Sequence, residues 1–233
     1  MLSKSEKYQI DNIIENIEND QETGFLDTRL INYIIPILKK KRIDYHIFKL
    51  FEEASKFIIH TKNHNAILLK INSKMNLHHS DILGSLFALG LDQNTFGDII
   101  IKNNQYYFAV KSNIVPLIMN DLHIIGKSKV EVNIVNIEEV SDYELQFEEI
   151  TLNVSSLRFD VIFSKITNLK RDTVSKKVKD KEIMINSQIL NNNSYLLKES
   201  DIISVRGYGK YIYDGIINKT KKDKNIVKLR KYI

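Results

Sequence analysis

The sequence predicts a mixed α+β protein assembled from small modules. Three features lead to this prediction: apolar residues at helical spacing near the N-terminus, a middle stretch where strand and helix patterns alternate, and a C-terminal stretch where two helical patterns precede several strands. A chain of 233 residues can form one large domain or two to three small ones. With 43% hydrophobic and 27% charged residues, the composition is typical of a globular protein.

Residues 1–62 are predicted to form a helical N-terminal region. An apolar stripe with i, i+3, i+4, i+7 spacing consists of Ile10, Ile13, Ile14 and Ile17. Asp27 is positioned to cap a second helix, and Pro36 is expected to kink or end that helix. The basic run at 39–42 is expected to be a solvated helix end, because cations stabilise a helix C-terminus.

Residues 63–136 are predicted to form the middle domain. In order, its expected elements are a strand over 65–71, a helix capped by Ser80 and ending at Gly90, two strands joined by a turn at Asn103 and Asn104, a helix from Ser112 and a strand over 127–135. The order β-α-β-β-α-β is the split plan shared by ferredoxin-like and RNA-recognition folds. The acidic stretch 137–152 is expected to be a linker.

Residues 153–233 are predicted to form a compact C-terminal α+β module. Two helical patterns, LRFDVIFSKI and the basic RDTVSKKVKD, come first. Strand-like pieces follow at EIMINS, around SYLL, at DIISVRG, at YGKYIYDGII and at NIVKLRKYI. Two small helices against a small twisted sheet account for this pattern.

Charge divides the chain more sharply than its net value of +5 suggests. Residues 154–233 hold 18 Lys and Arg against 8 Asp and Glu, a balance of +10, whereas residues 1–153 hold 16 against 21, a balance of −5. A basic module on an acidic body is the electrostatic footprint of a nucleic-acid binder. A merely solvated basic surface is the alternative interpretation.

The glycine pair in SVRGYGK, residues 204–210, invites comparison with nucleotide-binding loops. A dinucleotide fingerprint requires a third glycine where Ile212 stands, and a P-loop requires Ser or Thr where Tyr211 stands. The following YIYDGII alternates like a strand, so no helix N-terminus is available to hold a phosphate. We interpret the stretch as a strand end at which glycines relieve crowding.

Cations with interspersed tyrosines surround that strand end and the second basic helix. Such a combination suits a phosphate backbone and unstacked bases. The members are Arg171, Lys176, Lys177, Lys179, Arg206, Tyr208, Lys210, Tyr211, Lys219, Lys221, Lys222 and Lys224. Simple solvation of the lysines in NKTKKDK, residues 218–224, remains an alternative interpretation.

Catalytic and metal chemistry have weak signals in this sequence. The H-x3-H pair His60 and His64 lacks cysteine or H-E-x-x-H support, so ordinary histidines explain it. Asp98 near His79 is the best acid–base pair, and a turn aspartate with a helix-start histidine explains it equally well. We expect no catalytic residue, no metal and no cofactor.

Aromatic residues also occur where an RNA-recognition sheet would stack bases. The run is Tyr106, Tyr107 and Phe108, and the full RNP1 motif is absent, so Phe108 is expected to belong to the core.

No apolar run approaches the roughly 18 residues that span a bilayer. The N-terminus lacks the apolar core of a signal peptide, and the absence of cysteine fits a reducing compartment. We therefore expect a cytoplasmic protein with no membrane partner.

The segment VSSLRFDVIFSKI, followed by RDTVSKKV, IMIN and DIISVRGYGK, resembles the S4 (αL-type) RNA-binding domain. The upstream LGSLFALGL, FGDIII and IGKSKVEV, with FLDTRL at 25–30, make the chain similar to the YlmH-like family. That resemblance implies an N-terminal region, an RRM-like middle domain and a C-terminal S4 domain. Arg158 and Arg171 match basic positions of the S4 helices, and Asp160 is expected to be a structural partner of a nearby cation.

The chain departs from the family pattern at three places. Lys170 replaces a serine and thereby removes an expected helix cap, and Lys181 replaces a glycine, so that turn is expected to be built differently. The stretch KLFEEASK at 49–56 lacks the glycine pair and Glu-Arg of the family, which leaves a function of that motif in doubt.

The resemblance implies a non-enzymatic RNA-binding factor of the large ribosomal subunit. Its implied partners are the rRNA of the 50S subunit and peptidyl-tRNA on stalled, obstructed particles in ribosome-associated quality control, together with the tailing factor of that process; off the ribosome we expect a monomer. The expected RNA contacts are Arg158, Lys170, Arg171, Lys176, Lys177, Lys179, Arg206, Tyr208, Lys210, Lys219, Lys221 and Lys222. The alternatives are an RNA-modifying enzyme whose S4 domain delivers the substrate, and a cell-division-associated interaction protein.

Overall fold

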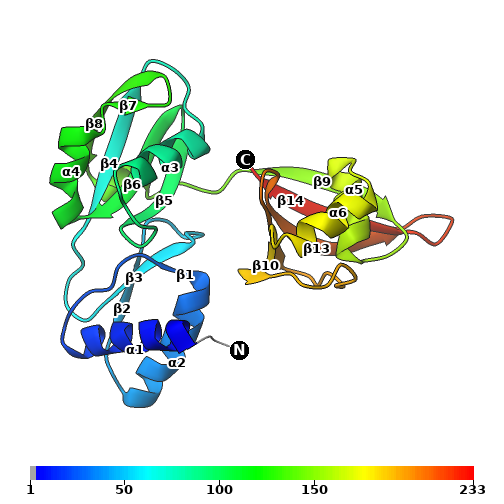
Figure 1. Cartoon of the computed structure of the whole chain (residues 1–233), viewed down its shortest axis with the longest axis horizontal. Helices are drawn as coiled ribbons and strands as arrows, with labels where there is room; N and C mark the ends of the chain where they lie inside the picture. The colour runs from blue at the N-terminus through cyan, green and yellow to red at the C-terminus, as the bar shows by residue number, and fades with distance from the viewer. Residues whose placement is uncertain (1–3) are drawn as a thin grey trace. The chain divides into compact units, whose positions relative to one another are not determined.

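A computed structural model describes residues 4–233, which divide into two compact units (Figure 1). The first unit ends at Glu144 and the second is Leu145–Ile233. Both units combine helices with antiparallel sheets, which confirms the predicted α+β class. The predicted boundaries at 62 and 136 stay a prediction, whereas strand β9 (Phe147–Val154) crosses the one at 152.

The N-terminal part of the first unit contains two helices and a small sheet. The helices are α1 (Lys4–Glu18) and α2 (Thr28–Lys41), and the strands β1 (Leu26–Asp27), β2 (His46–Lys49) and β3 (Lys56–His60) lie in the order β1-β3-β2. The predicted helical stripe is confirmed: Ile10, Ile14 and Ile17 are buried in one cluster with Ile34 and Leu38 of α2. The strands were not expected, because each is only two to five residues long.

Helix α2 begins and ends as its polar residues predict. Asp27 is the N-cap, and its side chain accepts a hydrogen bond from the backbone N–H of Leu30 at 2.9 Å. The basic run supplies the last turn, with Arg42 as the C-cap. Of the two outcomes expected for Pro36, a kink or the end of the helix, the end does not occur, because the helix continues through it to Lys41. The buried Ile34 and Leu38 on either side hold the helix despite the lost backbone donor.

The rest of the first unit is the predicted β-α-β-β-α-β arrangement. Its elements are β4 (Ala66–Ser73), α3 (His79–Ala88), β5 (Phe96–Lys102), β6 (Gln105–Lys111), η1 (Ser112–Ile114), α4 (Val115–Asp121), β7 (Ile124–Ile125) and β8 (Ser128–Val135). The strands lie in the order β5-β6-β4-β8-β7, all antiparallel. One face of the sheet packs on α3 and α4 through Leu69, Phe108, Ile82 and Ile118, all fully buried or nearly so.

The turn chemistry of this sheet is largely as predicted. Asn103 and Asn104 join β5 to β6 with φ of 51° and 57°, as a two-residue hairpin requires. Gly90 follows α3 with φ of 77°. Ser80 is not the cap of α3, because the N-cap is His78, two residues earlier. The backbone N–H of His78 donates to the Asp81 carboxylate at 3.2 Å.

The second unit is a six-stranded antiparallel sheet with two helices. Its elements are β9 (Phe147–Val154), α5 (Phe159–Thr167), α6 (Arg171–Lys179), β10 (Ile183–Ile185), β11 (Gln188–Ile189), β12 (Asp201–Val205), β13 (Gly209–Lys219) and β14 (Asn225–Tyr232). The strand order is β11-β10-β12-β13-β14-β9. Helices α5 and α6 lie side by side (Figure 1). The strand expected around SYLL is absent from the described structure, where Leu196 makes only an isolated bridge to Arg158.

Strand β9 corrects the expected linker 137–152. The first part of that stretch holds a 3-10 turn, η2 (Ile137–Val140), whereas residues from Phe147 onward pair along β14. The apolar side chains at 150, 152 and 154 alternate and pack on the core of the second unit. The acidic residues before them pair with cations of β14: Glu149 with Lys228 and Glu148 with Lys231. The acidic residues led to the prediction of a linker, although the alternating apolar residues at 150, 152 and 154 are typical of a strand.

A close contact between distant segments fixes the N-terminal part of the first unit on the middle sheet. A Cβ added to Gly97, in β5, would lie 2.9 Å from Cε1 of the buried Phe25. We expect Gly97→Ala to destabilise the first unit by about 1–3 kcal/mol, since overpacking displaces a buried ring. Denaturant dependence of amide exchange in β4 and β6 measures this change. Gly84→Ala is the control, because a Cβ there meets nothing within 4 Å, and an equal loss for both variants would contradict the contact.

Candidate nucleic-acid interface

The starts of α5 and α6 bring together two of the predicted arginines. Arg158 is the N-cap residue of α5 and Arg171 is the first residue of α6. Asp160, whose side chain is 4% exposed, lies between them and accepts hydrogen bonds from both. Its carboxylate accepts hydrogen bonds from Nε and Nη2 of Arg158 at 3.0 Å each. It also accepts hydrogen bonds from Nε and Nη2 of Arg171 at 3.2 and 2.5 Å. The prediction that Asp160 partners a cation is confirmed, and it partners two.

The electrostatics of this cluster favour a fixed, positively charged pair of guanidinium groups. Burial alone would raise the pKa of Asp160, but the hydrogen bonds from Arg158 and Arg171 outweigh it, so the pKa of this carboxyl lies below its ordinary value. Its side chain is thus an anion at neutral pH, and two cations on one anion leave a net charge of +1. Arg158 and Arg171 keep 37% and 56% of their side chains exposed, so donors remain available to an external phosphate.

A second group of predicted residues gathers at the other end of α6. Lys177 Nζ lies 2.7 Å from a carboxylate oxygen of Glu182 and 5.1 Å from the centre of the Tyr208 ring. The pKa of Glu182 is lowered by the hydrogen bond from Lys177 and further by the charges of Arg206 and Lys176. Three cations therefore surround one carboxylate, beside an aromatic ring that packs edge-on against Phe163.

These two groups lie at the two ends of α6. Arg171 and Lys177 are six residues apart on the helix, which is about 9 Å along its axis. We call these two groups the α6 surface and define it by Arg158, Arg171, Lys176, Lys177, Arg206 and Tyr208. Glu182 was missed in the sequence because its role depends on a contact between the helix end and the start of β10.

The turn between β12 and β13 holds Arg206 and Tyr208 in place. Val205 pairs with Gly209, which leaves a three-residue loop. Gly207 and Gly209 have φ of 81° and 96°, and a Cβ on either would meet nothing within 4 Å. The expectation that these glycines relieve crowding is therefore wrong; they permit a left-handed backbone that L side chains rarely adopt. Lys210 lies beyond the turn, over the ring of Tyr232 at 4.7 Å.

The lysines of the β13–β14 hairpin lie apart from the α6 surface. Strand β13 is 11 residues long, so its ends are roughly 33 Å apart. Lys219 stands at the far end and pairs with Asp223 at 3.0 Å, while Lys221 and Lys222 are exposed in the turn that follows. The predicted contact set is thus divided between two ends of one strand.

Two positions that depart from the family pattern have clear local consequences. Lys170 is the N-cap residue of α6 and makes no capping hydrogen bond with its side chain, as predicted from the missing serine. Lys181 adopts φ of 58°, in the left-handed region that favours glycine, and the expectation of a differently built turn stays a prediction. Lys170 and Lys179 are exposed at opposite ends of α6.

The weaker catalytic and metal candidates have structural roles. Asp98 accepts hydrogen bonds from Ser55 N, Ser55 Oγ and Lys56 N at 2.8, 2.5 and 2.9 Å, which ties β5 to the segment before β3. Burial lowers the pKa of His79. His64 stacks on Phe48 with ring centres 3.9 Å apart. Within residues 4–233, no three His, Cys, Asp or Glu side chains are arranged to hold a metal ion.

The aromatic run of β6 does not form an open stacking platform. Tyr106 and Phe108 face the helices and belong to the core, as predicted for Phe108. The buried hydroxyl of Tyr106 accepts a hydrogen bond from the backbone N–H of Leu77 at 2.8 Å. Tyr107 points to the opposite face and is 3% exposed. Residues 137–144 of the same unit lie over it, with a carboxylate oxygen of Glu139 3.4 Å from the Tyr107 hydroxyl.

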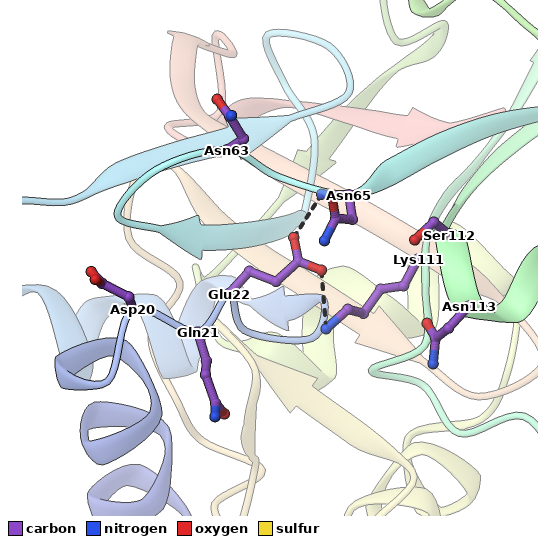
Figure 2. A pocket seen from close by; sticks show the side chains of 8 residues that line it. All are labelled: Asp20, Gln21, Glu22, Asn63, Asn65, Lys111, Ser112 and Asn113. Carbon is purple, nitrogen blue, oxygen red and sulfur yellow. Dashed lines mark hydrogen bonds and ion pairs between the residues drawn. The ribbon is translucent and has the colours of Figure 1, made fainter.

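The first unit also has a polar hollow of about 420 Å³ (Figure 2). The carboxylate of Glu22 lies in it, 2.7 Å from the backbone N of Asn65 and 3.2 Å from Lys111 Nζ. Figure 2 shows both interactions, and Gln21 and Asn113 also line the hollow. Because Glu22 neutralises Lys111, this hollow lacks the excess positive charge that would hold a phosphate.

No helix in the described part of the chain is long and apolar enough to cross a membrane.

Comparisons with known proteins bear on residues 60–139 and on the fold. A protein-family profile described as "Putative RNA-binding domain in YlmH" matches residues 60–139. The chain is 27% identical over 150 residues to the Bacillus subtilis (strain 168) protein named "Ribosome-associated protein quality control protein P2". That alignment covers 64% of this chain and 58% of the relative, so it spans less than two thirds of the relative's length.

A solved structure shares the fold. It is described as "Cell division protein ylmH from Streptococcus pneumoniae" and is similar with a TM-score of 0.53 at 14% identity, over 61% of this chain and 98% of that one. The matched profile and the curated relative agree with the motifs of the sequence: the chain is similar to proteins of the YlmH-like family.

Proposed function

We propose that this protein is an RNA-binding factor that holds ribosomal RNA through the α6 surface of its second unit. One observation carries the proposal: a buried carboxylate fixes two exposed guanidinium groups at one end of α6, and lysines with a tyrosine flank the other end. Fixed guanidinium groups suit phosphate, and the aromatic ring suits an unstacked base. We further propose that the second unit is a module of the S4 type.

The charge distribution supports the proposal that the second unit binds the phosphates of the RNA. The profile match to an RNA-binding domain covers residues 60–139, which hold seven Lys against seven Asp and Glu. Four of those lysines are paired with carboxylates: Lys62, Lys70, Lys102 and Lys111. The balance of +10 lies instead in residues 154–233. Because phosphate contacts supply most non-specific affinity, the first attachment to RNA is expected there.

The biological setting is proposed from the relative's name, which refers to ribosome-associated quality control. We propose that the target is the large ribosomal subunit that is stalled and still holds peptidyl-tRNA, that the tailing factor of this process is a partner, and that the protein acts in the cytoplasm as a monomer when off the ribosome. In this proposal the protein stabilises RNA without catalysis, metal or cofactor.

Sedimentation of a tagged full-length chain tests this setting. In a sucrose gradient of cell lysate we expect the protein with free 50S particles that carry peptidyl-tRNA, and not with 70S ribosomes. Recovery at the top of the gradient, under conditions that leave 50S particles intact, would refute a ribosomal role. Loss of one modified nucleoside on gene deletion, restored by the purified protein, would show an RNA-modifying enzyme instead.

A further inference from the structure

The middle sheet has a second face, opposite to α3 and α4, with side chains suited to single-stranded RNA. Lys70 of β4, Tyr107 of β6 and Ile100 of β5 are neighbours in register across three strands. Lys70 Nζ lies 5.4 Å from the centre of the Tyr107 ring. Lys102 follows two residues after Ile100 and therefore shares its face. An aromatic ring between two lysines can stack a base while the cations hold the flanking phosphates.

An acidic segment of the same unit covers this face. The segment comprises residues 137–144 and contains Glu138, Glu139, Asp142 and Glu144. A carboxylate oxygen of Glu139 lies 3.6 Å from Lys70 Nζ and 3.4 Å from the Tyr107 hydroxyl. Lys102 Nζ donates to the Glu139 carbonyl at 2.9 Å and to the Asp142 carboxylate at 2.5 Å. Two carboxylates thus sit on the two lysines where phosphates would bind.

Apolar contacts hold the acidic segment in place beside these ion pairs. Val140 is fully buried, and the ring of Tyr143 meets Phe51 edge-on with ring centres 4.9 Å apart. By contrast, Glu138 is exposed and its side chain makes no ion pair within the described residues. The segment carries its charge toward the sheet at Glu139 and Asp142 and toward solvent at Glu138. It leads directly to Leu145, where the second unit begins.

We propose that Lys70, Tyr107 and Lys102 form a second RNA-binding face, which the acidic segment covers and which single-stranded RNA uncovers by displacing Glu139 and Asp142. The inference goes beyond the proposed function, because it places a separate site on the first unit. Carboxylates and phosphates compete for the same two ammonium groups, so occupancy by RNA and by the segment is mutually exclusive. Attachment of RNA to the second unit raises the local concentration of phosphate near this face.

Neutralising the segment tests the competition directly. In the full chain, Glu139→Gln/Asp142→Asn is expected to tighten binding of a labelled 12-nucleotide oligouridine by about 5-fold at low salt, since the two lysines lose their internal anions. The matched control is Glu138→Gln/Asp121→Asn, two exposed residues outside the ion pairs, with the same change of net charge. An equal gain in the control would refute the site, and so would no gain in the test variant.

Two further arms locate the effect and separate it from the proposed function. Adding Lys70→Met and Lys102→Met must abolish the gain; a gain that survives contradicts the inference. The gain is also measured in chains that carry Arg171→Ala/Lys176→Ala/Lys177→Ala. If those three changes leave the affinity for RNA unchanged, the proposed function is wrong. The increase in affinity caused by Glu139→Gln/Asp142→Asn still tests the second RNA-binding face independently.

Amide hydrogen exchange gives a readout that does not depend on a variant. Within the segment, Glu139 N–H bonds to Asn136 O at 3.1 Å, Ser141 N–H to Glu138 O at 3.2 Å, and Tyr143 N–H to Val140 O at 3.0 Å. Saturating oligouridine is expected to speed exchange of these three amides several-fold, because displacement opens their turns. Slower or unchanged exchange, with binding confirmed in the same sample, would overturn the proposal.

Discussion

Replacing Arg171, Lys176 and Lys177 together by alanine is expected to weaken RNA binding by about 100-fold at 0.1 M salt. The same triple variant should lower the slope of log affinity against log salt by about 2, since each lost phosphate contact removes roughly 0.7–0.9. Arg171 begins α6 and Lys176 and Lys177 lie in its last turn, and Arg171 keeps 56% of its side chain exposed. Filter binding to a fragment of large-subunit RNA at several salt concentrations measures both quantities.

A triple variant with the same charge change controls for net charge. Lys39, Lys40 and Lys127 are exposed cations of the first unit that make no ion pair in the region the structure describes. Their replacement by alanine removes three charges but no member of the α6 surface. We expect a change in affinity of less than about 5-fold. An unchanged salt slope in the α6 variant, or equal losses in both variants, would contradict the assignment of the α6 surface.

Asp160→Asn is expected to destabilise the second unit by about 1–3 kcal/mol at neutral pH. Removing one partner of a buried ion pair can cost more, about 3–5 kcal/mol, but both arginines here are partly exposed and can be rehydrated. The neutral amide cannot accept four charge-assisted hydrogen bonds, so the starts of α5 and α6 lose their shared anchor. Denaturant dependence of amide exchange in β12 and β13 measures the free energy of unfolding of this unit.

The pH dependence gives a second signature of the same cluster. The folded state lowers the pKa of Asp160 below its unfolded value, so folding is stabilised while the carboxyl is ionised. That contribution is fully present above about pH 4, the ordinary range of an aspartate, and is lost as the pH falls through the lowered pKa. The wild type should therefore approach the stability of Asp160→Asn on acidification. A constant difference down to pH 2 would contradict the role of the anion.

Asp172→Asn is the matched control for both measurements. Asp172 is exposed in the first turn of α6 and makes no ion pair within residues 4–233. Only its interaction with the helix N-terminus is lost, which is worth about 0.3–1 kcal/mol. Equal destabilisation by the two substitutions would show that the ion pairs of Asp160 with Arg158 and Arg171 do not stabilise the second unit.

Much of the fold could be predicted because its local signals agree with its tertiary contacts. The isoleucine stripe of α1, the cap at Asp27 and the Asn103-Asn104 turn each depend on residues close in sequence. Strand β9 was not predicted, although Ile150, Leu152 and Val154 alternate as in a strand. Its acidic first half is typical of a linker, and only the structure shows that Glu149 pairs with Lys228 of β14.

The residues of the α6 surface could be predicted from the sequence, but the contacts among them could not. Basic residues on α6 and in the β12–β13 turn are visible in the sequence. That Asp160 holds two arginines, and that Glu182 gathers cations from a helix and a turn, depends on contacts between elements. The same limit applies to Lys70 and Lys102, whose charges are neutralised by a segment about 40 to 70 residues away. The glycines at 207 and 209 were located correctly and explained wrongly.

Crosslinking of the full-length protein to purified large ribosomal subunits tests whether the α6 surface contacts ribosomal RNA. Ultraviolet irradiation followed by mass spectrometry identifies the peptides that carry RNA adducts. We expect adducts on peptides that contain the α6 surface, with Tyr208 and its neighbours in the β12–β13 turn prominent because aromatic rings contact bases. Adducts confined to the first unit, with none on α5, α6 or that turn, would contradict this expectation.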